Sequence, residues 1–162
     1  MELNINRSTM LSVTSQYALR ALTQLAKIKD EPIMLGKELA EKAEIPPNYL
    51  AKILLLLKNA GLLGTARGSR GGYWLIREPQ SIRLIDIVLL FDQSANPQPC
   101  ILGQKEQCSE DLPCSAHQRW QQIRTAYLEF LESTTIADLA TDSPKASPPE
   151  AKAELTATGP TN

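Results

Sequence analysis

The sequence has no long hydrophobic run. No apolar stretch is longer than Ile53 to Leu57, whereas a membrane-spanning helix needs about 20 predominantly apolar residues. The N-terminus also lacks the basic, apolar and cleavable pattern of a secretory signal. With 162 residues, of which 43% are hydrophobic, the chain can form one modest domain with appendages. We therefore expect a cytoplasmic protein without a membrane span.

Histidine is almost absent, since His117 is the only one. Without a second histidine or a paired catalytic set, the sequence offers no active-site constellation, and we do not expect an enzyme. Glycines 68, 71 and 72 lie close together, which raises the question of a phosphate-binding loop. The motif G-x-x-x-x-G-K-[ST] between a strand and a helix is missing, so an NTPase has little support.

Cysteine is also scarce, but all three cysteines fall in one segment. Cys100, Cys108 and Cys114 precede His117 in the order C-x7-C-x5-C-x2-H. Thiolate and imidazole bind zinc or the iron of iron–sulfur clusters, so this concentration indicates a metal or cluster site. Structural disulfides do not fit, because the cysteine count is odd and cytosolic thiols stay reduced. Ordinary buried cysteines are the remaining interpretation, and the polar residues between them disfavour it.

The residues around the cysteines predict a loop followed by a helix. They are mostly Pro, Gly, Gln, Glu, Lys and Asp, which form no apolar strand or helix face. Ser109 or Asp111 could cap a helix that opens near Pro113. Cys114 and His117 would then lie on one face of its first turn.

The net charge of −1 hides an uneven distribution. Residues 1–90 carry 12 Lys/Arg against 8 Asp/Glu, whereas residues 91–162 carry 5 against 10. Within 46–83 the only acidic residue is Glu78. The basic residues there are Lys52, Lys58, Arg67, Arg70, Arg77 and Arg83. This local excess is typical of a phosphate-binding surface.

The N-terminal half predicts a helix-turn-helix. Apolar positions at three- and four-residue spacing predict a helix from about residue 15, capped by Thr14 or Ser15 and ending near Lys29. A short helix over 36–42 and a tight turn over 43–45 follow. Pro46 and Pro47 suit the start of a third helix that runs to residue 60, with Gly61 as its C-cap. In this pattern the N-terminal residues of the later helix enter the major groove.

The next residues predict a wing and then two more helices. Extended segments over 62–63 and 73–76 flank a glycine-rich basic turn over 65–72, which together form a β hairpin. An amphipathic helix is predicted from Ser81. After His117, an apolar stripe repeats along a helix of about twenty residues, and dimerisation is its natural use, with packing against its own domain as the alternative. From Ala140 the composition predicts a disordered tail.

These features together resemble the IscR-like winged-helix repressors of bacteria, a family that also includes nitric-oxide and cysteine-metabolism regulators. The resemblance covers roughly Met10 to Leu139. Its marks are Leu11-Ser12 with Tyr17-Ala18-Leu19, Tyr49-Leu50 through Lys58-Asn59-Ala60-Gly61-Leu62, the wing Arg67-Gly68-Ser69-Arg70-Gly71-Gly72-Tyr73, and the Cys–Cys–Cys–His order.

The resemblance implies a homodimeric regulator of transcription that binds double-stranded operator DNA. Members with three cysteines bind an iron–sulfur cluster that tunes DNA affinity or site choice. A 2Fe–2S cluster is favoured here, with 4Fe–4S as the alternative, and the expected ligands are Cys100, Cys108, Cys114 and His117. The expected DNA-binding residues are Thr14, Ser15, Asn48, Tyr49, Lys52, Arg67, Ser69 and Arg70. The expected dimer residues are Trp120, Ile123, Tyr127, Phe130 and Leu131.

The implied organisation is an N-terminal extension (1–9), a winged helix-turn-helix domain (10–92), a cysteine segment (93–114), a dimerisation helix and its end (113–139), and a tail (140–162). The first cysteine interval is x7, where cluster-binding members commonly have x5. Gln16 stands where the nitric-oxide branch has an aspartate ligand, which argues against that cluster type. Ala51 stands where the IscR recognition helix has a glutamate that tunes base choice, so the operator sequence does not carry over.

Two other functions remain open. One is a regulator of the same fold without a cluster, responding to a thiol or metabolite, although three cysteines and His117 argue against it. The other is a zinc-binding CCCH module that binds RNA. Its last interval would be x3 rather than x2, and no aromatic residues lie between these cysteines to stack on bases.

Overall fold

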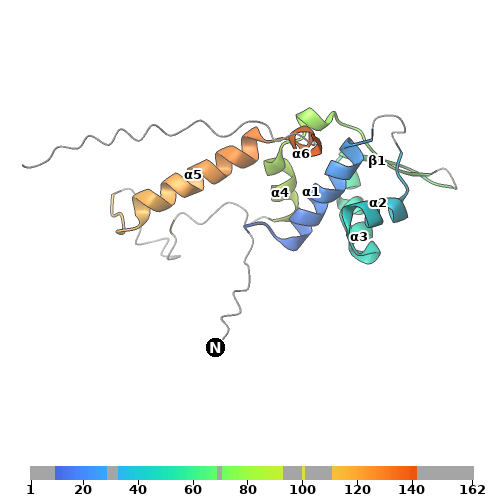
Figure 1. Cartoon of the computed structure of the whole chain (residues 1–162). Coiled ribbons are helices and arrows are strands. Elements are labelled where there is room, and N and C mark those ends of the chain that lie inside the picture. The colour runs from blue at the N-terminus through green and yellow to red at the C-terminus, as the bar shows by residue number, and fades with distance from the viewer. Residues whose placement is uncertain (1–9, 29–32, 69–70, 93–99, 101–110, 142–162) are drawn as a thin grey trace, which may run out of the picture.

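The computed structural model describes residues 10–28, 33–68, 71–92, 100 and 111–141. Within them the chain is mainly helical, with a small two-stranded antiparallel sheet (Figure 1). The elements are α1 (Val13–Ala26), α2 (Gly36–Ala43), α3 (Pro47–Asn59), β1 (Leu63–Ala66), β2 (Gly72–Leu75), the 3₁₀ turn η1 (Pro79–Ser81), α4 (Leu84–Phe91), α5 (His117–Ser133) and α6 (Ile136–Ala140). The predicted extension and residues 142–162 of the predicted tail lie outside the described residues.

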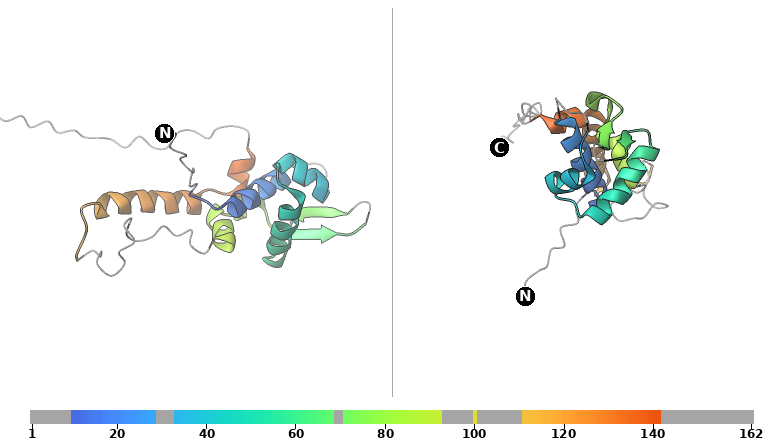
Figure 2. Two further views of the ribbon diagram at one scale, coloured as in Figure 1. Left: turned by 90° about the horizontal axis from the view of Figure 1, so that it is seen from below. Right: turned by 90° about the vertical axis from the view of Figure 1, so that its right-hand side faces the viewer.

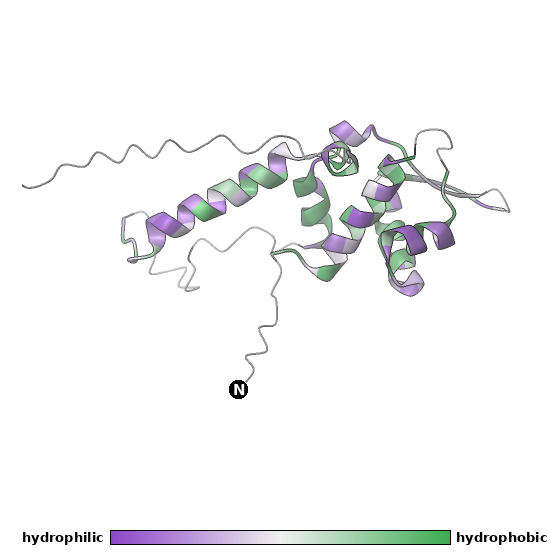
Figure 3. Cartoon of the chain, in the orientation of Figure 1, coloured by the Kyte–Doolittle hydropathy of each residue, from purple (hydrophilic) through white to green (hydrophobic). Residues whose placement is uncertain are grey.

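Helices α1 to α4 and α6 pack around one apolar core, whereas α5 projects from it on the side away from the wing (Figures 1 and 2). Leu22 of α1, Leu39 of α2, Leu57 of α3 and Ile87 of α4 have no exposed surface. Helix α4 is apolar along almost its whole length (Figure 3). Removal of these side chains from water is the main favourable term in folding, so the core fixes how the four helices meet.

Helix α1 begins earlier than the sequence predicted. Its N-cap is Ser12, whose Oγ accepts a hydrogen bond from the Ser15 backbone N–H at 3.1 Å. The Ser12 N–H donates to Oδ2 of Asp92 at the end of α4, at 3.0 Å. The prediction of Thr14 or Ser15 as the cap was wrong, because Asp92 holds Ser12 in the capping position from 80 residues away, and nothing in the local spacing indicates that contact.

The turn between α2 and α3 is tight, as predicted. Glu44 adopts the left-handed conformation with φ 51°, and the N–H of Ile45 donates to the Ala40 carbonyl at 2.9 Å. Pro47 occupies the first turn of α3, where a missing N–H costs nothing. Helix α3 ends at Asn59, and Gly61 follows with φ 72°, one position after the C-cap, Ala60.

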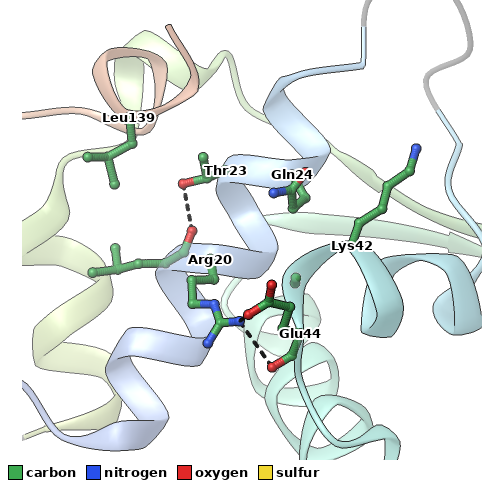
Figure 4. A pocket seen from close by; sticks show the side chains of 8 residues that line it. Arg20, Thr23, Gln24, Lys42, Glu44 and Leu139 are labelled. Atoms are coloured by element: carbon green, nitrogen blue, oxygen red, sulfur yellow. Dashed lines mark hydrogen bonds and ion pairs between the residues drawn. The ribbon is translucent and has the colours of Figure 1, made fainter. Parts of the chain in front are cut away.

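Arg20 of α1 fastens this turn to the rest of the domain. Its Nη2 donates to the backbone carbonyl and to Oε2 of Glu44, both at 3.1 Å (Figure 4). These side chains lie at a shallow hollow of ≈ 410 Å³ between α1, α2 and α6. Lys42, which also lines it, pairs with Glu38 at 2.8 Å. Because both cations already have carboxylate partners, we interpret the hollow as a joint between helices rather than an anion site.

The wing is an antiparallel hairpin in which Leu63 pairs with Leu75 and Ala66 with Gly72. The Trp74 ring lies directly over Gly64, so closely that an added Cβ would come within 2.2 Å of the ring. A third segment, not anticipated from the sequence, joins the sheet at Met34. Its N–H donates to the Tyr73 carbonyl at 3.0 Å and its carbonyl accepts from the Tyr73 N–H at 2.9 Å. The wing is thereby anchored to the residues just before α2.

The C-terminal helices differ in detail from their predictions. Helix α4 begins at Leu84, after the η1 turn, rather than at residue 81, and α5 has 17 residues. The short α6 was missed, and it ends at Ala140, where the tail was predicted to begin. It starts with a capping box between Thr135 and Asp138. The N–H of Ile136 donates to the Ile82 carbonyl at 2.9 Å, which ties the end of α5 back to the domain.

Candidate nucleic-acid interface and cysteine segment

Helix α3 has one buried face and one exposed face. Its buried side chains are Leu50, Ile53, Leu54 and Leu57. The exposed side carries the three residues predicted to face DNA, Asn48, Tyr49 and Lys52, together with Ala51 and Leu55. The structure therefore brings the predicted residues of this helix together on the accessible side, which is the geometry that major-groove binding requires.

Tyr49 is held by aromatic contacts with α1. Its ring meets that of Tyr17 edge to face, with centroids 6.4 Å apart, and the Arg20 guanidinium lies 5.7 Å from the Tyr17 ring centre. Tyr49 itself is 60% exposed. The edge-to-face contact joins the start of α3 to α1, and the cation–π contact within α1 places the Arg20 guanidinium beside the Tyr17 ring.

The wing contributes Arg67, which is exposed near the hairpin tip, followed by Gly68 with φ 103°. The other predicted wing residues, Ser69 and Arg70, lie outside the described residues. A cleft of ≈ 560 Å³ separates the wing from α3, and its lining includes Lys58 from the helix and Arg67 from the wing. Two cations at an open cleft, one from each side, suit a strand of the phosphate backbone.

Two of the basic residues in 46–83, Arg77 and Arg83, form hydrogen bonds within the domain. Arg77 donates through Nη2 to the Ser81 carbonyl at 3.0 Å. Arg83 donates to both carboxylate oxygens of Asp86, at 3.1 and 2.8 Å. The hydrogen bond and charge of Asp86 raise the pKa of the Arg83 guanidinium. Both arginines remain exposed, but the Asp86 carboxylate offsets the charge of Arg83, so the net positive charge of this region is smaller than the number of basic residues in 46–83 indicates.

The two predicted DNA-binding residues at the start of α1 differ in exposure. Thr14 is exposed, but Ser15 is fully buried and its hydroxyl accepts a hydrogen bond from Ser12 Oγ at 3.1 Å. Adjacent helical residues point about 100° apart, so the two side chains face different environments here. The Ser15 prediction is therefore wrong for a direct side-chain contact.

The predicted metal ligands are only partly described. Cys100 is buried, with 2% of its surface exposed, and Cys114 and His117 are half-buried. Cys108 lies outside the described residues. Among the residues that the structure describes, no three metal-binding side chains come together. Cys114 lies in the turn before α5 and not within it, because the helix begins at His117, whose N–H donates to the Cys114 carbonyl at 3.0 Å.

One residue before the cysteine segment and one in the helix after it contact the N-cap of α1 or the residues that precede it. Asp92, immediately before the segment, accepts the hydrogen bond from the Ser12 N–H. Tyr127 of α5, after the segment, donates its hydroxyl to the Met10 carbonyl at 3.4 Å. Burial, and then the Asp92 charge, raise the pKa of the Tyr127 phenol, which keeps its O–H available as a donor. The sequence contained no signal for either contact, since each joins residues far apart in the chain.

The apolar stripe of α5 is divided between two environments. Ile123 is 55% and Phe130 is 51% exposed, whereas Trp120 and Tyr127 are half-buried. Leu131 is fully buried in the core of its own domain. The assignment of Leu131 to a dimer interface is therefore corrected: Leu131 packs on its own domain, whereas the adjacent Phe130 is exposed.

A helix-turn-helix followed by a two-stranded wing defines a winged helix-turn-helix protein. Residues 11–142 match the model of the Rrf2 family, described as iron-dependent transcriptional regulators. The chain is also 36% identical over 132 residues to a protein of Aquifex aeolicus (strain VF5) assigned as an HTH-type transcriptional regulator, covering 80% of this chain and 90% of that protein. This chain belongs to the Rrf2 family of transcriptional regulators.

Two solved structures are similar throughout the domain. CymR, the global cysteine regulator of B. subtilis, superposes with a TM-score of 0.67 at 32% identity, covering 80% of this chain and 95% of that chain. T. potens IscR gives a TM-score of 0.62 at 26% identity, covering 85% and 93%. These relatives are regulators and not enzymes, which supports the non-enzymatic interpretation. Within the described residues, no helix has the length and apolar character needed to cross a membrane.

Proposed function

We propose that this protein is a homodimeric DNA-binding regulator that senses iron–sulfur status or redox state through a cluster held in the cysteine segment. The observation that carries the DNA-binding part is the exposed face of α3 beside a wing that presents Arg67 at the same cleft as Lys58. Helix and wing can then engage adjacent grooves, with a phosphate strand between them.

The donor set fits an iron–sulfur cluster. Cys100, Cys108, Cys114 and His117 supply three thiolates and one imidazole, which are ligands that such clusters accept. The turn bond between His117 N–H and the Cys114 carbonyl keeps two of these residues adjacent, and Cys100 is shielded from water. A bound cluster would supply a group that changes charge or is released on oxidation.

The contacts near the cysteine segment could transmit a structural change in that segment to the DNA-binding surface. Asp92 contacts Ser12, the N-cap of α1, and Tyr127 contacts Met10, two residues before that cap. Helix α1 in turn contacts Tyr49 and Glu44. A change within the segment that moves Asp92 would therefore move the N-cap of α1. That displacement would alter the contacts by which α1 positions α3, the helix proposed to enter the major groove.

A regulator of the same fold without a cluster is the second candidate. The observation that favours it is the similarity to CymR, which is a global cysteine regulator. In that case the half-buried thiol of Cys114 would respond directly to a thiol or oxidant. Iron and acid-labile sulfide, assayed after anaerobic purification, distinguish the two candidates.

The proposed dimer uses the exposed part of the α5 stripe. Ile123 and Phe130 lie seven positions apart and therefore on nearly the same side of the helix, and each has about half of its surface exposed. Helix-turn-helix regulators generally bind two half-sites as symmetric dimers, and α5 projects away from the wing, where a second copy can reach it (Figure 2).

Arg67→Ala should weaken DNA binding and reduce the slope of log affinity against log salt by about 0.9 for each phosphate that the side chain neutralises in the wild type. Arg83→Ala is the matched control, because Asp86 already holds that guanidinium, and it should leave both quantities unchanged. Binding titrations at several salt concentrations measure both. If Arg67→Ala binds DNA with wild-type affinity and salt slope, Arg67 of the wing does not contact DNA.

Ile123→Ala should raise the dissociation constant of the dimer about tenfold, because an apolar side chain of α5 no longer fills the surface of the second copy. Leu131→Ala should instead lower the free energy of unfolding by about 2–5 kcal/mol, because it opens a cavity in the core. Sedimentation equilibrium and urea denaturation separate the two effects. Unchanged association of Ile123→Ala would contradict the proposed interface.

Cys108→Ala should abolish the visible absorption of the cluster, since the chain has no fourth cysteine to supply the thiolate instead. His117→Cys should retain a cluster with an altered spectrum and greater resistance to oxidation, because thiolate is readily accepted by iron. Circular dichroism should show folded protein in both cases. A wild-type protein that is colourless, free of sulfide and loaded with zinc would instead establish the zinc alternative, and a metal-free one the thiol-responsive alternative.

A further inference from the structure

The exposed face of α3 contains an apolar side chain near its centre. With 3.6 residues per turn, positions 48, 51, 52 and 55 lie on one side of the helix, opposite the buried Leu50, Ile53 and Leu57. Leu55 is 58% exposed on that side, and the small Ala51 lies one turn before it. The core of the domain does not use these two residues.

The surroundings of Leu55 are cationic. Lys52 and Lys58 are exposed on the same helix, and Arg67 lies on the wing across the cleft that Ala51 and Leu55 also line. A partner that covers this surface must therefore carry negative charge on its flanks and apolar groups at its centre. A DNA major groove meets both requirements, because phosphates border it and the C5-methyl of thymine is the apolar group on its base edges.

We propose that Leu55, with Ala51 beside it, contacts thymine methyl groups in the major groove and so selects thymine at one or two positions of each half-site. This inference rests on the proposed DNA-binding function and adds the chemical class of the base that α3 prefers. Ala51 contributes by its small size, which lets the helix approach the base edges closely. Asn48 and Lys52 are then left to bind the polar edges of neighbouring bases.

The test uses the full-length protein and duplexes selected by that protein from random-sequence DNA. Each dT of a selected half-site is replaced in turn by dU, which removes only the methyl group. We expect affinity to fall about fourfold at one or two positions, the factor that burial of one methyl group is worth. Replacement at the remaining positions should have no effect.

Leu55→Ala identifies the side chain responsible. Because Leu55 is exposed, this variant should fold normally, and it should bind dT and dU duplexes equally well at the sensitive positions. Leu56→Ala is the matched control: Leu56 is also an exposed leucine of α3, at 45%, but lies about 100° around the helix from Leu55. It should retain the discrimination of the wild type.

Three outcomes would overturn the proposal. The wild-type protein could bind its selected duplex with no position sensitive to dU, or Leu55→Ala could keep the discrimination of the wild type. Leu55→Ala could also change the oligomeric state while leaving DNA affinity unaltered, which would make this surface a protein contact. If instead no duplex is selected at all, the proposed DNA-binding function fails, and with it this inference.

Discussion

The hydrogen bond from the Ser12 N–H to the Asp92 carboxylate joins the two parts of this protein on which the proposed function depends, helix α1 and the cysteine segment. Ser12 caps α1, so the bond fixes where that helix begins. Asp92 immediately precedes the cysteine segment (93–114) in the sequence, so the same bond joins the residue before that segment to the cap of α1. An N-cap contributes about 1 kcal/mol to a helix, and a charge-assisted bond is stronger than a neutral one. A small displacement here therefore has a measurable cost.

Helix α1 can carry such a displacement to the DNA surface because its contacts lie at the base of the recognition helix. Tyr17 packs against Tyr49, and Arg20 binds both the side chain and the backbone of Glu44. The same helix thus touches the cap next to the cysteine segment and the turn that sets the orientation of α3. A regulator needs two sites linked by an element that both can bias, and α1 is the element that contacts both sides in this structure.

Local patterns predicted the parts of the fold that local physics determines. Apolar spacing, Pro46-Pro47 and Gly61 indicated α3, and the glycine-rich basic stretch indicated the wing. The cap of α1, the Met34 pairing and the docking of α6 were not predictable, because each depends on a partner distant in sequence.

The exposure of each leucine in the run 54–57 also could not be predicted from residue type. Leu54 and Leu55 are adjacent and chemically identical, yet Leu54 is buried and Leu55 lies on the surface. For the site, clustering identified the candidate ligands but not their arrangement.

The coupling between the cysteine segment and DNA is the central claim, and one comparison tests it. The DNA dissociation constant of the full-length protein is measured with and without its cluster, prepared anaerobically, for the wild type and for Asp92→Ala, which removes the acceptor of the Ser12 hydrogen bond. The predicted result is a large ratio between the dissociation constants of the two states in the wild type, which shrinks toward one in Asp92→Ala while the cluster spectrum persists. A wild-type ratio of one, or a ratio that Asp92→Ala leaves unchanged, would contradict the coupling.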